Sequence, residues 1–169
     1  MTQTEAANER EMLVAYLNSQ RNHVLGNLEG LSEEDLKRPV LPSGWTCLGL
    51  VQHLAIDVER FWFQAVTAGE PDIVQEMSGE GNAWQVAPDG QAHDIFSLYR
   101  QEIERSNAII AATPLDAAPA WWPDFFGNFR LDNLRDTILH VMVETACHAG
   151  HADAARELID GKQWMVLTD

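Results

Sequence analysis

Positively charged side chains are scarce in this sequence. It has 11 Lys and Arg against 26 Asp and Glu, a formal net charge of −15 at pH 7, and no basic run. Proteins that bind nucleic acids need a basic surface to displace counterions from the phosphates. Docking on an anionic membrane also calls for basic side chains. The composition therefore argues against both nucleic acid and membrane as partners.

Long apolar runs are absent, and cysteine is rare. No stretch approaches the ~20 apolar residues that a membrane-spanning helix needs. The N-terminal segment MTQTEAANEREM is polar and lacks the apolar core of a secretory signal. The two cysteines, Cys47 and Cys147, lie far apart in the sequence, and without a signal we expect both to stay reduced. We therefore expect a cytoplasmic protein.

The alternating pattern of a β-strand is missing as well, whereas helical periodicity is present in four segments. These segments cover about residues 5–28, 46–67, 93–112 and 132–159. Thr46 is a candidate N-cap for the second helix, and Gly161 is a candidate stop for the fourth. The chain has 169 residues, 46% of them hydrophobic, which suits one compact domain over 1–169. We predict an all-α four-helix bundle in which long crossovers join some neighbours.

The fourth helical segment carries a stripe of polar side chains that could bind a metal ion. At about 100° per residue, Glu144, His148 and His151 lie within about 80° of His140 around the helix. Glu144 and His148 are four residues apart, so one lies above the other and the two could grip one ion. Cys147 points about 100° away from His148 and is not expected to share that ion.

A third ligand must come from another helix, and His53 is the best candidate. It lies in an otherwise apolar stretch, where a buried imidazole needs a polar partner. Asp57 follows four residues later and could hold the His53 ring from behind. Elsewhere, we expect Cys47 to be a small buried residue and Arg156 to pair with Glu157 at the surface.

Two histidines and one carboxylate form a ligand set used by zinc, and the same set on iron supports oxygen chemistry. No redox motif accompanies the set, so zinc is preferred. From the residues alone, interpretations without a metal stay open. His53 could be a core histidine with satisfied hydrogen bonds, and Glu144 with His148 could be a solvated polar stripe. His140 and His151 are weaker candidates, for lining the pocket or supporting a ligand.

Two segments carry a family resemblance: SGWTCLGLVQHLAIDVERFWF, which contains His53, and HVMVETACHAGHADAARELIDG. The pairing of WTCLGLVQHL with the pattern E-x3-H-x-G-H, which starts at Glu144, resembles the DinB-like superfamily. Within this superfamily, the two segments are more similar to the branch related to mycothiol-dependent maleylpyruvate isomerases. This resemblance implies a single DinB-like four-helix bundle and a divalent metal bound by His53, Glu144 and His148. His151 matches the second histidine of the pattern.

The resemblance also implies a thiol-dependent transferase or isomerase. We predict a metal-dependent thiol S-transferase that uses a low-molecular-weight thiol such as mycothiol to attack a small electrophile. Zinc is the expected metal, with nickel and iron as alternatives. His151 and His140 are candidate catalytic proton carriers, and a homodimer is expected from the family. The alternatives are a metal-dependent hydrolase that activates water, a non-enzymatic stress protein that binds a metal or ligand, and a purely structural polar stripe.

Overall fold

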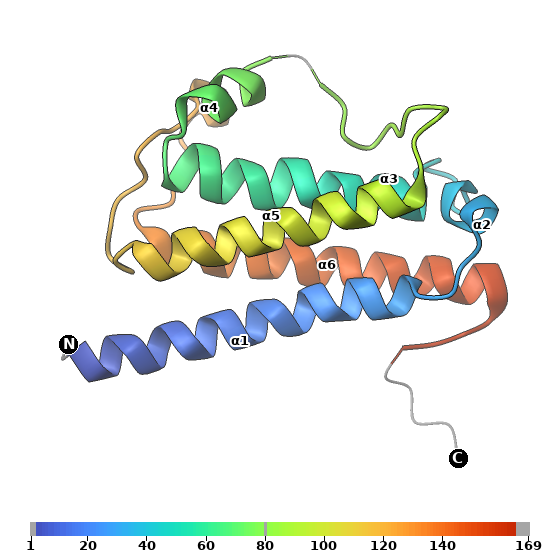
Figure 1. The fold of residues 1–169 in the computed structure, drawn as a ribbon, viewed down its shortest axis with the longest axis horizontal. Helices are drawn as coiled ribbons and strands as arrows, with labels where there is room; N and C mark the ends of the chain where they lie inside the picture. Colours follow the sequence, from blue (N-terminus) through green and yellow to red (C-terminus); the bar gives the residue numbers. More distant parts are fainter. Residues whose placement is uncertain (1–2, 80, 165–169) are drawn as a thin grey trace.

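The computed structural model describes residues 3–79 and 81–164, and every regular element in that range is helical (Figure 1). The predicted all-α fold is therefore confirmed. No helix among the described residues is long and apolar enough to cross a bilayer. The elements in chain order are α1 (Gln3–Leu28), α2 (Glu33–Lys37), α3 (Cys47–His53), η1 (Leu54–Thr67), α4 (Pro71–Met77), α5 (Ala92–Ala112), η2 (Asp124–Phe126) and α6 (Leu134–Asp160).

Four long helical rods form the bundle: α1, α3 continued by η1, α5, and α6. In Figure 1, α1 and α6 run in the same direction, whereas α3 with η1 and α5 run the opposite way. The main packing contacts join α1 to α6, α5 to η1, and α6 to η1. Parallel neighbours need a connection that returns along the bundle, and residues 68–91, which include α4, form it. The predicted crossover is confirmed there, while residues 113–133 join α5 to α6 at one end.

Local side chains fix where the helices begin and end. The Thr46 side chain accepts a hydrogen bond from the Gly49 amide, which confirms it as the N-cap of α3. Asn133 caps α6 in the same way, by accepting from the Asp136 amide. At the other end of α6, Gly161 has φ 77°, a left-handed conformation that glycine adopts without strain.

The second helical segment is not one uniform α-helix. Its first part, α3, is α-helical, and its second part, η1, is a π-helix of 14 residues. A π-helix has i→i+5 hydrogen bonds and is wider than an α-helix, and short examples occur often at functional sites. Most η1 side chains are buried, including Phe63 at 0% exposure, because α5, α6 and α4 all pack against it. His53, the predicted ligand, is the last residue before this change of helix type.

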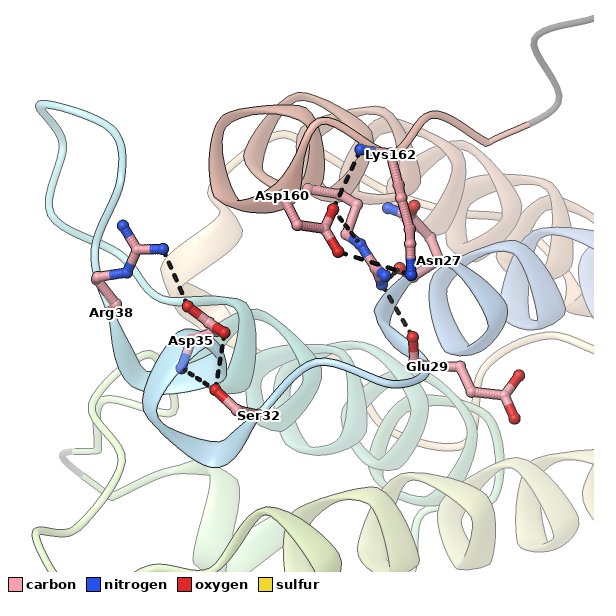
Figure 2. Close-up of polar contacts among 8 residues, drawn as sticks. Asn27, Glu29, Ser32, Asp35, Arg38, Asp160 and Lys162 are labelled. Carbon is pink, nitrogen blue, oxygen red and sulfur yellow. Dashed lines mark hydrogen bonds and ion pairs between the residues drawn. The ribbon is translucent and has the colours of Figure 1, made fainter. Parts of the chain in front are cut away.

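Arg156 ties the end of α6 to the end of α1, so the predicted surface pairing with Glu157 is wrong. Its side chain is 3% exposed and donates to the backbone carbonyls of Asn27 and Glu29 and to the Asp160 carboxylate. Figure 2 shows Asn27, Glu29 and Asp160 gathered around this point, with the Ser32 cap of α2 beside them. The guanidinium supplies the donors that carbonyls at a helix C-terminus lack.

Candidate metal centre

The packing of η1 and α3 against α6 brings His53 and His148 together. Their ring centroids are 5.0 Å apart and the ring planes cross at 74°. Both side chains are mostly covered, at 14% exposure for His53 and 11% for His148. These two histidines come from distant parts of the sequence, are mostly covered and pack edge to face, and imidazole nitrogens are donors that zinc uses.

Glu144 lies one helical turn before His148, as its spacing predicts. Its Oε2 atom is 3.8 Å from Nε2 of His148, beyond hydrogen-bonding distance, and its side chain is 41% exposed. Burial, followed by the neighbouring charges of His53 and His151, lowers the pKa of His148 to about 4. His148 is therefore neutral near pH 7, which is the protonation state that a metal ligand requires.

Asp57 holds the ring of His53 from the far side. Its Oδ2 atom lies 2.8 Å from Nδ1 of His53. A carboxylate oxygen only accepts, so Nδ1 carries the proton, and in the neutral ring Nε2 keeps a free lone pair. A carboxylate behind a histidine is the usual support for a metal-binding imidazole, because it fixes the tautomer and raises the basicity of the other nitrogen.

Trp84 covers His53, a contact that no sequence pattern predicts. The two rings are stacked with centroids 4.3 Å apart. Trp84 lies in the crossover, which has no periodic pattern, and Gln52 holds this loop by donating to the Ala83 carbonyl at 2.8 Å. Gly49 allows the close approach, since a Cβ there would lie 2.3 Å from the Trp84 carbonyl oxygen. A glycine in the first turn of α3 was the one available hint.

The two remaining candidate histidines have different surroundings. His151 is exposed and adjoins the pair, with its Nδ1 atom 3.3 Å from Nδ1 of His148. His140 lies instead among aromatic rings, 4.5 Å from Trp62 and 5.6 Å from Phe129 between centroids. Burial lowers the pKa of His140, partly opposed by the charge of Glu144. Only His151 touches the pair directly among these two.

The donor types fit a divalent ion, but their side chains do not converge on one point. Within residues 3–79 and 81–164, no group of three His, Cys, Asp or Glu side chains is arranged to hold a metal. Zinc sites nevertheless use these ligand types: neutral His148, Nε2 of His53 and the exposed carboxylate of Glu144. The ligand set of His53, Glu144 and His148 stays a prediction.

Comparison with protein families adds an independent finding. Residues 12–161 match the family model described as MST, mycothiol-S-transferase. The match covers the four long rods from within α1 to the end of α6. A search of curated proteins found no match.

Proposed function

The chain belongs to the mycothiol S-transferase family, and on this premise we propose that it is an enzyme that joins a low-molecular-weight thiol such as mycothiol to an electrophilic small molecule. The family itself implies the thiol cosubstrate and the transfer reaction. The observation that supports a site is the meeting of His53 and His148, with Glu144 and Asp57 beside them. The proposal includes a single domain over 1–169 and a homodimer.

The reaction forms one carbon–sulfur bond. The thiol loses its proton, and the sulfur donates an electron pair to the electrophilic carbon. A leaving group departs with its bonding electrons, or, in an addition, a neighbouring atom takes up a proton instead. The thiolate is the reactive form, so a site that favours it at neutral pH accelerates the attack.

His53, Glu144 and His148 would hold a divalent ion, with zinc preferred over nickel or iron. The positive charge of that ion, when bound, favours the thiolate over the thiol. Asp57 keeps the proton on Nδ1 of His53, and Trp84 limits the access of water to that ring.

Two histidines remain as carriers for the proton that the thiol loses. Nε2 of the exposed His151 is the nearer candidate, because its Nδ1 already contacts His148. His140 is the second candidate. Burial that lowers its pKa keeps it neutral and so able to accept a proton near pH 7.

An assay of thiol consumption tests the proposal. Purified protein with measured metal content is incubated with an electrophile and with mycothiol or another small thiol. We expect His148→Ala to lower kcat/KM by about a hundredfold or more, since losing a ligand should exceed the 10–100-fold cost of losing its support. His93→Ala is the matched control, because His93 is 88% exposed and lies on α5.

Three outcomes would decide between the functions. If the metal-loaded protein consumes no thiol above the uncatalysed rate, the transferase proposal fails. Turnover of an ester or amide without any thiol would instead support the hydrolase. Ligand binding that survives His148→Ala, without turnover, would support a binding protein.

A further inference from the structure

A cavity of about 490 Å³ adjoins the candidate metal centre. It lies between η1, α4, the crossover loop and η2, and it shares Asp57 with the centre, since Asp57 both lines the cavity and bonds His53. A small-molecule site of this kind is usually concave and mostly apolar, with a few placed polar groups. The lining residues are Gln52, Ile56, Asp57, Phe61, Glu76, Met77, Gly79, Gly81, Asn82, Ala83, Phe125 and Phe126.

Three aromatic rings form one wall of this cavity. Phe125 and Phe126 meet edge to face with centroids 4.7 Å apart, and Phe61 meets Phe126 at 5.9 Å. Behind them, Trp62 stacks on Phe126 with planes 3° apart, which holds that ring in place. Phe125 is 67% exposed at the rim and is free to contact a further ring. Such a wall favours an aromatic guest, because aromatic pairs gain energy beyond the area that they bury.

The charged side chains among the described lining residues are all acidic. Asp57 and Glu76 supply carboxylates, and none of the described lining residues is Lys or Arg. The nearby cation, Arg60, already binds Glu76 at 2.7 Å and Glu102 at 2.7 Å, so its charge is compensated. An anionic guest would meet these carboxylates with no basic side chain among the described lining residues to pair with, whereas an uncharged guest would avoid that repulsion.

We propose that this cavity is the subsite for the electrophile, and that the electrophile is an aromatic compound without negative charge. The inference rests on the proposed transferase function and narrows its substrate class. The reaction is a displacement: the thiolate sulfur forms a bond to a ring carbon, the leaving group departs with its electron pair, and the thiol proton passes to a base or to solvent. The position of Asp57 places the guest beside the ring of His53.

Binding without reaction tests the subsite separately from catalysis. Dinitrobenzene has no leaving group, so its affinity is measured by calorimetry on the full chain in the absence of any thiol. We expect Phe125→Ala to weaken binding about fivefold, because it removes an aromatic partner from the rim. Tyr16→Ala is the matched control, since Tyr16 is an aromatic residue with 62% exposure on α1 and does not line the cavity. Equal affinities in the two variants, or no binding to the wild type, would overturn the subsite.

A pair of electrophiles tests the predicted preference for a compound without negative charge. Chlorodinitrobenzene is uncharged, and chlorodinitrobenzoate adds a carboxylate to the same reactive ring. Each rate is divided by its uncatalysed rate, and we expect a larger ratio for the uncharged compound. Glu76→Gln removes one partly screened negative charge, so it should lower the quotient of the two normalised rates about threefold. Glu70→Gln is the control, because Glu70 pairs with Arg105 on the surface outside the cavity.

The two proposals fail in different ways. If dinitrobenzene binds and Phe125→Ala weakens it, but no thiol is consumed, the transferase function fails and the aromatic subsite stands. If thiol is consumed but Phe125→Ala and Tyr16→Ala bind dinitrobenzene equally well, the function stands and the subsite fails. If the wild type gives the larger rate ratio with the carboxylate-bearing compound, the predicted preference for an uncharged electrophile is wrong.

Discussion

At the scale of single residues, the two cysteines have opposite environments. Cys47 is 1% exposed at the start of α3, and burial raises the pKa of its thiol to about 11. Its expected role as a small buried residue is confirmed. Cys147 is exposed on α6. Because only the thiolate is nucleophilic, reactivity toward reagents in solution should follow exposure and pKa together.

We predict that iodoacetamide at pH 8 modifies Cys147 in the folded protein and spares Cys47. At that pH, about one Cys47 thiol in a thousand is ionised, and the reagent cannot reach it. Peptide mass spectrometry after timed labelling measures both sites, and Cys147→Ser should leave the native protein unlabelled. Labelling of Cys47 at the rate of Cys147 would contradict the burial of α3.

Cys147 also bears on the chemistry, because it directly precedes His148. Its predicted orientation, about 100° around the helix from His148, stays a prediction, and its side chain is exposed. In the proposed transfer, the reacting thiol belongs to the cosubstrate that the family implies. Neither Cys47 nor Cys147 is therefore assigned a role as the nucleophile in the proposed reaction.

At the scale of elements, the sequence predicted where helices lie better than what kind they are. The predicted segment 46–67 is one continuous rod, but its second part is the π-helix η1. Periodicity could not reveal this, because apolar residues occupy more than one side of the segment and fit several helical repeats. The π-helix η1 packs against α5, α4 and α6, and the pattern of its own residues does not show these neighbours.

The same limit explains which site residues were predicted. Glu144 and His148 share α6, and His53 and Asp57 lie four residues apart on the continuous rod of α3 and η1, so helical spacing places each pair. Trp84 lies in an irregular loop that is held by Gln52, which is far away in the sequence. No local sequence pattern predicts that Trp84 stacks on His53. The prediction for Arg156 was wrong for a related reason, because its carbonyl partners Asn27 and Glu29 lie at the end of α1 and just after it, far away in the sequence.

A buried ion pair fastens α1 to η1, and it carries the next prediction. Arg21 donates to both carboxylate oxygens of Glu59, at 2.7 and 2.6 Å, with side-chain exposures of 1% and 0%. We expect Glu59→Ala to lower the free energy of unfolding by about 3–5 kcal/mol, because it leaves a buried charge without its partner. Denaturant unfolding followed by circular dichroism measures this loss.

Glu33→Ala is the matched control for this variant. Glu33 pairs with Lys37 on the surface of α2, with exposures of 43% and 33%, and such pairs contribute about 0–1 kcal/mol. Replacing both core partners, in Arg21→Met with Glu59→Leu, should recover much of the loss by removing both buried charges. A cost for Glu59→Ala as small as that for Glu33→Ala would show that the pair is not the link between α1 and η1.

At the scale of the whole molecule, the proposed metal site joins rods that are far apart in the chain. His53 ends α3, whereas Glu144 and His148 lie in the middle of α6. Unfolding separates these rods, so an ion held by all three residues would bind the folded state and not the unfolded one. Metal binding and global stability should therefore be coupled.

We predict that divalent metal raises the melting temperature of the full chain by about 10 °C at a concentration near a thousand times its Kd. That concentration stabilises a single-site protein by about 4 kcal/mol, and each kcal/mol shifts the midpoint by about 2–4 °C at this size. Chelation should remove the gain. His53→Ala should abolish the difference between loaded and chelated protein, while His93→Ala, on the exposed face of α5, should keep it. Calorimetric scans of the three proteins, each in the loaded and the chelated form and with metal content checked, measure the coupling. An unchanged midpoint after verified metal removal would mean that no ion joins α3 to α6, and the transferase chemistry would then have to arise from the histidines alone.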